Sequence, residues 1–333
     1  MEVATLKKVM RLGGPVVITN HQNPDGDAMG AALGLHRVLT RVGFDSKVVV
    51  PNAYPDFLHW MTGHKEVVNC EAHPRVAKRL FKEAKVIFVL DYNAPSRSGC
   101  LEPLFQETKA TIVMVDHHRE PDESFADIMY SDPSKSSTSQ MIFELIRELG
   151  HLEYLDREGA ECLFTGIMTD TGSFRFSSTT PSTLMVAADL LARGVKPHMI
   201  HEKIYDTNSE NRMRLLGRML EDMDYVKELN TTILFLGKSD LKKFHYQRGD
   251  SEGFVNYGLS MTGVKLSAFF REEEDKVKIS FRSKGTFDVN TLARTHFNGG
   301  GHLNAAGGSF DGSLKKAIEK FKSILPEYAK ELK

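Results

Sequence analysis

Residues 16–27 read VVITNHQNPDGD, and this stretch decides the fold that we expect. Its apolar first part leads directly into a loop that carries His21, Asp25 and Asp27. Short β-rich apolar runs of this kind are typical of buried strands in a parallel sheet. In open sheets of parallel strands, ligands bind outside the carboxyl ends of the strands. The stretch therefore predicts a strand that ends in a binding loop.

Similar segments occur three more times along the chain. Apolar residues 86–90 precede Asp91, apolar residues 112–115 precede the triplet 116–118 (DHH), and Asp170 follows an expected helix at 158–168. A single Asp after a strand is often only the N-cap of the next helix, and this alternative applies to Asp27 and Asp91 taken alone. Four concordant segments in one domain favour a shared site instead.

The first part of the chain alternates strands and helices. We expect a helix over 27–41, with Gly43 just past its end as a stop signal, and a strand over 46–50. The alternation continues to residue 115, which is typical of an α/β domain with a doubly wound, mostly parallel sheet. Further helices are expected over 139–149, 158–168, 179–194 and 209–227.

A smaller α+β domain is expected in the last third of the chain. Strands are predicted over 231–236, 265–270 and 276–282, followed by a short helix over 289–296 and an amphipathic helix that starts near residue 314. We therefore expect three parts: the α/β domain over 1–195, a helical linker over 196–228, and the α+β domain over 229–333.

Composition limits the possible functions. The 333 residues are enough for two domains. Their formal net charge of −1 argues against a protein that coats long nucleic acid, which usually has a large basic surface. Short fragments need only a local positive pocket and stay possible. Three cysteines without C-x-x-C spacing are typical of reduced thiols, and no apolar run is long enough to cross a bilayer. We expect a cytoplasmic protein.

The candidate ligands predict a site for two divalent cations. They are mixed imidazoles and carboxylates: His21, Asp25, Asp27, Asp91, His117 and Asp170. Such a set suits a borderline-hard ion such as Mn²⁺, with Mg²⁺ as an alternative. Gly26 permits a tight turn between its two acidic neighbours. Two ions held a few ångströms apart lower the pKa of a bridging water and clamp an attacked phosphorus.

A second cluster lies in the C-terminal part. Residues 299–301 are three glycines followed by His302, and Arg282 lies upstream. Glycines let the backbone approach a ligand and can form an anion-binding nest of N–H groups, while Arg offers a planar fork for phosphate oxygens. A flexible turn and a surface ion pair with Glu272 or Glu273 are the alternatives.

These motifs resemble the signatures of a known family. The pattern HxxPDGD at 21–27, with Asp91, the DHH triplet at 116–118 and Thr169-Asp170, resembles the DHH phosphoesterase family. The tail, Arg282-Ser283-Lys284 with GGGH at 299–302 and AAGG at 305–308, resembles the C-terminal substrate domain of that family. Within the family, size and tail are similar to the branch of bifunctional oligoribonucleases (nanoRNases) and 3′-phosphoadenosine-5′-phosphate (pAp) phosphatases.

The resemblance implies a role for each site residue. One Mn²⁺ would be bound by His21, Asp25 and Asp91, and the second by Asp27, Asp91, His117 and Asp170. Asp116 would orient His117, and His118 would face the scissile phosphate as a hydrogen-bond donor or acid. The nucleophile would be a hydroxide that bridges the metals. A terminal phosphate and nucleotide would be held by Arg282, Ser283, Gly299, Gly300, Gly301 and His302.

We therefore expect a metal-dependent phosphoesterase. It would hydrolyse very short RNA oligonucleotides to nucleoside 5′-monophosphates and pAp to AMP. Alternatives are a single-stranded DNA exonuclease, a pyrophosphatase or polyphosphatase of the same family, and a non-catalytic nucleotide-binding regulator. A homodimer through the linker helices is also possible, whereas no membrane and no long nucleic acid are expected as partners.

Four other features have simpler explanations. We interpret Arg97 as a solvated loop charge, Phe174 and Phe176 as packing residues, and residues 136–138 as a helix cap. Four histidines have no partners at ligand spacing and are interpreted as surface residues: His59, His64, His73 and His151.

Overall fold

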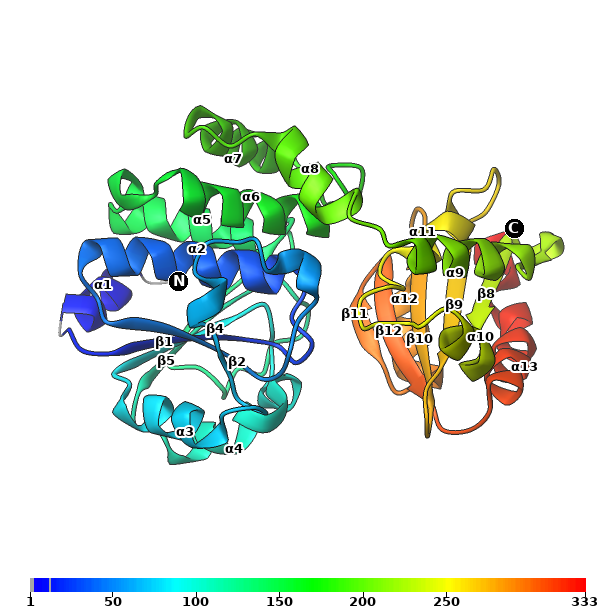
Figure 1. Ribbon diagram of the computed structural model, residues 1–333, viewed down its shortest axis with the longest axis horizontal. Helices are drawn as coiled ribbons and strands as arrows, with labels where there is room; N and C mark the ends of the chain where they lie inside the picture. Colours follow the sequence, from blue (N-terminus) through cyan, green and yellow to red (C-terminus); the bar gives the residue numbers. More distant parts are fainter. Residues whose placement is uncertain (1–2, 12) are drawn as a thin grey trace. The chain divides into compact units, whose positions relative to one another are not determined.

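The computed structural model describes residues 3–11 and 13–333. The chain divides into two compact units, Met1–Thr207 and Asn208–Lys333 (Figure 1). The division falls inside the region 196–228 that the sequence predicts as a helical linker: α8 (Pro197–Tyr205) belongs to the first unit and α9 (Glu210–Glu221) to the second.

The first unit is built on a parallel sheet of six strands. Their order across the sheet is β3-β2-β1-β4-β5-β6. The strands are β1 (Val16–Asn20), β2 (Ser46–Val50), β3 (Val68–Asn69), β4 (Val86–Leu90), β5 (Thr111–Asp116) and β6 (Ile128–Ser131). The chain winds in one direction from β1 to β3 and in the other from β4 to β6, so the strand order reverses between β1 and β4. Ligands bind at such a switch point in doubly wound folds. The predicted fold class is confirmed.

Helices cover both faces of this sheet (Figure 1). One face carries α2 (Gly26–Val42), α5 (Thr138–Leu149) and α6 (Arg157–Asp170), with α7 (Pro181–Ala192) outside them. The other face carries α3 (Pro74–Glu83) and α4 (Glu102–Glu107). The remaining segments are α1 (Val3–Arg11) and the short 3-10 helices η1 (Asp56–Leu58), η2 (His64–Glu66), η3 (Pro95–Leu101) and η4 (Leu152–Tyr154).

Helices α2 and α6 approach each other closely because glycines lie at their contact. A Cβ atom on Gly30 would lie 2.5 Å from the carbonyl oxygen of Cys162, and a Cβ on Gly166 would lie 2.7 Å from Oδ1 of Asp27. No side chain fits at such distances. The sequence expectation of an α2 helix from 27 to 41 is accurate to one residue at each end, but the glycine contact was not anticipated.

The second unit has its own six-stranded sheet, in the order β11-β12-β10-β9-β8-β7. The strands are β7 (Asp224–Val226), β8 (Thr231–Leu236), β9 (Leu266–Glu272), β10 (Val277–Ser283), β11 (Gly300–His302) and β12 (Ala305–Phe310). All neighbours are antiparallel except β8 and β9. Helices are α10 (Lys238–Lys243), α11 (Phe254–Leu259), α12 (Val289–His296), α13 (Leu314–Ile324) and α14 (Ala329–Leu332), with 3-10 turns η5 (Lys227–Leu229) and η6 (Leu325–Tyr328).

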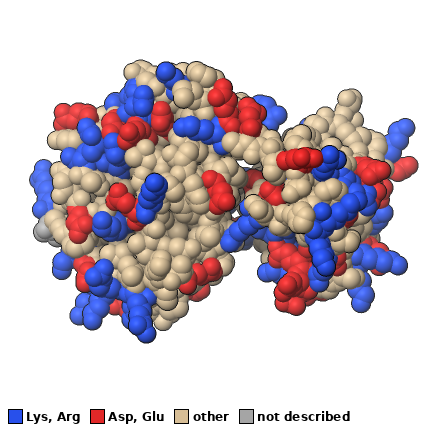
Figure 2. Space-filling view, viewed as in Figure 1, with Lys and Arg blue, Asp and Glu red and all other residues tan. Residues whose placement is uncertain are grey.

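Two predicted elements differ in this unit. The helix expected over 209–227 ends at Glu221, because residues 224–226 pair with β8 as strand β7. The glycine triplet, expected as a loop, contributes strand β11. Among the described residues, no helix is long and apolar enough to cross a membrane. Groups of positive and negative side chains are interspersed over the face shown in Figure 2.

Candidate metal centre

The predicted ligands of the first unit converge at the carboxyl ends of neighbouring strands. His21 follows β1, Asp91 follows β4, and His117 follows β5. Strands β1, β4 and β5 are adjacent and parallel, so their ends lie at one edge of the sheet, beside the reversal of strand order. Asp170 reaches this edge as the last residue of α6.

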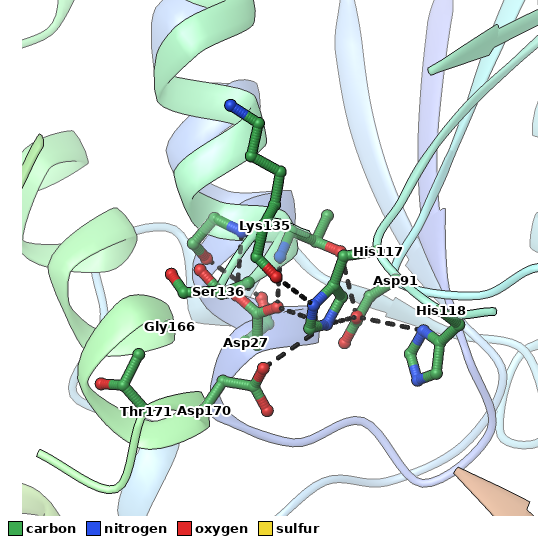
Figure 3. Close-up of polar contacts among 12 residues, drawn as sticks. Asp27, Asp91, His117, His118, Lys135, Ser136, Gly166, Asp170 and Thr171 are labelled. Carbon is green, nitrogen blue, oxygen red and sulfur yellow. Dashed lines mark hydrogen bonds and ion pairs between the residues drawn. The ribbon is translucent and has the colours of Figure 1, made fainter. Parts of the chain in front are cut away.

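Two groups of possible ligands share one carboxylate. His21, Asp25 and Asp91 form the first group, and Asp27, Asp91 and His117 form the second; within each group one donor atom per residue lies within 4.8 Å of the others. Asp170 adds to the second group, because its Oδ2 lies 3.4 Å from Nε2 of His117 (Figure 3). The structure thus brings all six predicted ligands together.

The imidazoles present the correct nitrogen to this cluster. Nδ1 of His117 lies 3.2 Å from the carbonyl oxygen of Lys135, and Nδ1 of His21 lies 2.9 Å from that of Gln22. A carbonyl can only accept, so each Nδ1 carries the proton. Nε2 of each ring therefore faces the carboxylates, at 3.4 Å from Asp91 in both cases. This is the arrangement of a metal-binding histidine.

The carboxylates are crowded in a way that a divalent cation would relieve. Burial raises the pKa of Asp27 well above its usual range, and the charges of Asp91 and Asp170 raise it further. Burial lowers the pKa of His117, but Asp91 and Asp170 outweigh it, and the net pKa is raised well above the usual value. These shifts favour protons on Asp27 and His117, whereas His117 and His21 lower the pKa of Asp91. Divalent cations with oxygen and nitrogen ligands would replace these protons. The donor set fits such ions.

The backbone at Asp91 is itself unusual. Its φ angle is +66°, in the left-handed region that few residues other than Gly, Asn and Asp adopt. The residue is 3% exposed, and its amide donates to the carbonyl of Val115 at 3.1 Å. This turn at the end of β4 places the carboxylate between the two ligand groups. Strain of this kind is often found at functional sites.

Helix capping and metal binding are combined in this site. Asp25 is the N-cap of α2, with Oδ1 accepting from the amides of Asp27 and Ala28 at 3.0 Å. The N-cap interpretation, considered for Asp27 and Asp91, applies to Asp25 instead. Asp27 accepts from the amides of Thr138 and Ser139 at the start of α5, at 2.7 and 2.9 Å.

Asp116 orients a different histidine from the one expected. Its Oδ1 lies 2.7 Å from Nδ1 of His118, and its Oδ2 accepts from the amide of His118 at 3.0 Å. The expectation that Asp116 orients His117 is therefore wrong. The ring of His117 contacts the carbonyl oxygen of Lys135 instead. The reason is that successive residues at the end of β5 point to opposite sides. Burial and the charge of Arg97 lower the pKa of His118.

Residues 135–139 were missed as contributors to the site. This support segment leads into α5 and touches three ligands. The carbonyl oxygen of Lys135 faces His117 (Figure 3). Thr138 Oγ1 donates to Asp91 at 3.0 Å, and the amides of Thr138 and Ser139 donate to Asp27. Ser137 caps α5 as expected, by accepting from the amide of Gln140. The Ser-Ser-Thr run signals a cap, but no sequence pattern shows which carboxylates the next amides meet.

The structure also shows what surrounds Phe174 and Arg97. Phe174 packs beside Phe164, with ring centroids 5.8 Å apart. Arg97, interpreted from the sequence as a solvated loop charge, is instead half-buried, and its charge contributes to the lowered pKa of His118. Its carbonyl accepts from the amide of Gln22 at 2.7 Å, so the backbone of η3 holds the loop of residues 21–27 in place.

The candidate substrate residues of the second unit have structural contacts of their own. Ser283 is 6% exposed; its hydroxyl donates to the carbonyl of Phe287 at 2.7 Å and accepts from Asn304 at 2.8 Å. Arg282 lies on the same strand, and its Nη1 donates to the carbonyl of Phe281 at 3.0 Å.

The glycine triplet does not form the expected anion-binding nest. The amide of Gly301 donates to Oδ1 of Asn290 at 2.8 Å, and that of Gly299 to the carbonyl of Ala293 at 3.2 Å. A Cβ atom on Gly301 would lie 2.4 Å from the carbonyl oxygen of Ala305. A Cβ on Gly299 would lie 1.9 Å from the carbonyl oxygen of Gly307, so both Gly299 and Gly301 are required by the close approach of β12.

Comparisons with known proteins agree with this architecture. Residues 15–167 match the DHH family, N-terminal domain, and residues 230–331 match the DHHA1 domain. The chain is 33% identical to the bifunctional oligoribonuclease and PAP phosphatase NrnA of Thermus thermophilus, over 92% of this chain and 88% of the relative. It is 27% identical to the cyclic-di-AMP phosphodiesterase GdpP of Bacillus subtilis, over 97% of this chain but only 49% of that protein.

A solved structure is similar over the same length. It is the crystal structure of an exopolyphosphatase-related protein from Bacteroides fragilis, with a TM-score of 0.95, 41% identity, and coverage of 99% of this chain and 97% of that one. Both domains match in the predicted order, and the Thermus relative is similar over nearly its whole length. The chain therefore belongs to the DHH family of phosphoesterases, hydrolases that act on phosphoester bonds.

Proposed function

We propose that this phosphoesterase hydrolyses very short RNA oligonucleotides to nucleoside 5′-monophosphates and pAp to AMP. The observation that carries the proposal is the pair of ligand groups that share Asp91. The named activities of the Thermus relative, an oligoribonuclease and PAP phosphatase, support the choice of substrates. The alignment covers 92% of this chain and therefore includes residues of both units.

The proposed metal ligands divide between the two groups. His21, Asp25 and Asp91 would hold one ion, and Asp27, Asp91, His117 and Asp170 the other. Bound divalent ions would lower the pKa of a coordinated water and neutralise phosphate charge. We propose Mn²⁺, with Mg²⁺ as the alternative, because imidazole and carboxylate donors suit both borderline and hard ions.

His118 is the proposed hydrogen-bond donor to the scissile phosphate. Its Nδ1 lies 2.7 Å from Oδ1 of Asp116, a contact that fixes the orientation of the ring. Burial and Arg97 lower its pKa, so the free protein holds a neutral ring at neutral pH. A substrate phosphate adds negative charge beside the ring, which favours a proton on Nε2. Asp116 keeps the ring oriented while that proton is held or transferred.

Residues of the second unit are proposed to hold the remainder of the substrate. Arg282 offers the planar guanidinium that suits phosphate oxygens. Ser283, Gly299, Gly300 and Gly301 would shape this site through the backbone contacts described above, and His302 would add a donor.

Turnover of several substrates side by side tests the proposal. The purified chain would be incubated, with and without Mn²⁺, with labelled dinucleotide, pAp, cyclic-di-AMP, pyrophosphate and a longer RNA of about 24 nucleotides. We expect mononucleotide from the dinucleotide and AMP from pAp, only with metal. Binding of pAp without turnover would instead support a nucleotide-binding regulator, and preferred cleavage of cyclic-di-AMP or pyrophosphate would refute the substrate assignment.

Two further parts of the proposal concern the cellular compartment and the oligomeric state. Cys70, Cys100 and Cys162 are free thiols, which is usual in a reducing compartment, so we place the enzyme in the cytoplasm. A homodimer through residues 196–228 stays a prediction. Met199 on α8 is 43% exposed and Met213 on α9 is 52% exposed, and light scattering would measure the mass in solution.

A further inference from the structure

The support segment 135–139 is itself fastened by a buried carboxylate. Glu144 lies on α5 and is 6% exposed. Its Oε2 lies 2.6 Å from Nζ of Lys135 and accepts from the hydroxyl of Tyr130 at 3.0 Å, while its Oε1 accepts from Nε2 of Gln140 at 3.0 Å. Three donors around one buried carboxylate offset the cost of removing it from water.

The side chain and the carbonyl group of Lys135 point in opposite directions. Figure 3 shows the ammonium pointing away from the carboxylate cluster, while the carbonyl of the same residue faces His117. The ion pair with Glu144 therefore fixes the residue from one side, and the hydrogen bond to His117 uses it from the other. A shift of the lysine would move the carbonyl that orients the imidazole.

Gln140 extends this network. It is fully buried, and its Oε1 accepts from the hydroxyls of Ser136 at 2.7 Å and Thr183 at 3.0 Å. Its Nε2 donates to Glu144 and, at 2.9 Å, to Ser182. All hydrogen-bonding positions of the amide are used, so its orientation is unique. The network ties the support segment to α5 and to the first turn of α7.

We propose that Lys135 and Glu144 are positioning residues for the ligand group of Asp27, Asp91 and His117. The inference rests on the proposed metal-dependent function. Contacts that orient a metal-bound histidine typically change metal affinity 10- to about 100-fold when they are lost. An exposed ion pair would contribute little, whereas loss of Lys135 here removes the positive charge that pairs with the buried carboxylate of Glu144.

The effect is confined to one half of the centre. His21 is oriented by the carbonyl of Gln22, and Asp25 by the first turn of α2. Lys135 instead orients His117 through its carbonyl oxygen, and His117 belongs to the second ligand group and not to the first. Loss of the Lys135–Glu144 pair should therefore weaken one of two metal sites and leave the other occupied.

Calorimetric titration of the full chain with Mn²⁺ tests this directly. For Lys135→Met and Glu144→Gln we expect one of two sites to bind 10- to about 100-fold more weakly, with kcat reduced more than KM is raised. Lys135→Arg should retain wild-type affinity because it keeps the charge. Glu107→Gln is the matched control: it removes an exposed carboxylate that lies 2.7 Å from Lys78, and both sites should be unchanged.

The possible outcomes separate the two proposals. Wild-type affinity at both sites with a lower melting temperature would show a merely structural pair and would overturn the inference. If Glu144→Gln does not fold, Lys135→Met and Tyr130→Phe decide by the same titration. The expected loss of affinity in a protein that leaves short RNA and pAp intact would support the positioning role and refute the proposed substrates. A wild-type chain that binds no Mn²⁺ would refute both.

Discussion

Asp91 meets three requirements at one position. It is shared by both ligand groups, it is almost completely buried, and its backbone has a φ angle of +66°. Asn tolerates this conformation as well as Asp does, but it has no negative charge. Asp91→Asn therefore separates the charge from the backbone geometry, which Asp91→Ala would disturb as well.

We expect Asp91→Asn to fold and to lose metal-dependent activity. Turnover of the dinucleotide should fall by more than about 100-fold, beyond the usual effect of an outer contact. The stabilisation by Mn²⁺, about 2.7 kcal/mol at 100 times Kd for a bound ligand, should also vanish from melting curves. Asp45→Asn, at an exposed position, is the control. Wild-type turnover in Asp91→Asn would disprove the bridging role.

Ser283 gives a second prediction for a single residue. Its buried hydroxyl joins Phe287 and Asn304, so Ser283→Ala leaves two polar groups without this partner. We expect the free energy of unfolding to fall by about 1–2 kcal/mol. The KM for the dinucleotide should rise less than in Arg282→Ala. Unchanged stability with a larger rise in KM would show that Ser283 contacts substrate directly, as the family resemblance implies.

Among the elements, α2 and α6 determine the geometry of the centre, because they carry Asp27 and Asp170. Their contact depends on glycines. In most helices Gly→Ala is stabilising by up to about 1 kcal/mol. At Gly30 the added Cβ would lie 2.5 Å from the backbone of α6, so one helix has to move.

We expect Gly30→Ala to lower the free energy of unfolding by about 1–3 kcal/mol, the usual cost of overpacking, and to weaken metal binding. Gly217→Ala is the matched control, since a Cβ there meets nothing within 4 Å; it should stabilise the chain slightly. Denaturant unfolding of both variants measures the difference. Equal effects of the two substitutions would contradict the close helix contact.

The start of α6 has a pH-dependent cap. Asp156 accepts from the amide of Gly159 at 3.1 Å and is paired with Arg37 at 2.7 Å. Burial raises the pKa of Asp156, but the hydrogen bonds from Arg37 and Gly159 outweigh it and hold the pKa below its usual value. The carboxyl group of Asp156 therefore binds a proton more readily in the unfolded chain than in the folded chain. This stabilisation is present above about pH 3.9 and is lost as the pH falls through the folded pKa.

Two substitutions separate the cap from the charge. Asp156→Ala should lower the free energy of unfolding by about 1 kcal/mol or somewhat more. Asp156→Asn keeps a good N-cap and should lose only the contribution of the partly exposed ion pair, below about 1 kcal/mol. Unfolding curves between neutral and acidic pH should show the Asn deficit disappear on acidification. A deficit that persists at low pH would rule out the charge as its cause.

Much of the element structure was predictable from local pattern. Apolar runs marked β1, β4 and β5, and the parallel α/β fold with a second α+β unit is confirmed. Gly43 marked the end of α2, as its left-handed conformation requires. One exception, β7, is a strand of three residues, too short for a periodic signal. It forms only because β8 offers it an edge.

The contacts within the site were less predictable. Residue types and strand ends were sufficient to nominate the six ligands that the structure brings together. They could not show that Asp116 holds His118, or that Lys135 faces His117, because such contacts depend on how distant segments pack. The glycine triplet shows the same limit: its spacing fits an anion nest, yet Gly299 and Gly301 are required by the close approach of β12.

At the scale of the whole molecule, the two units differ in what they contribute. All six proposed metal ligands lie in Met1–Thr207, whereas Arg282 lies in Asn208–Lys333. Each unit has separate clusters of buried apolar residues, and each exceeds the roughly 60 residues at which domains fold alone. Metal binding should therefore stabilise one unit and leave the other unaffected.

Differential scanning calorimetry of the full chain should show two transitions, of which Mn²⁺ raises one. At 100 times Kd the gain of about 2.7 kcal/mol corresponds to about 5–10 °C for a unit of this size. A fragment ending at Thr207 should keep this shift but hydrolyse the dinucleotide poorly, because it lacks Arg282. Asp91→Asn should abolish the shift and leave the second transition in place. If Mn²⁺ raised both transitions equally, either the units would unfold together or ligands from Asn208–Lys333 would belong to the centre, since a ligand stabilises only the cooperative unit that binds it.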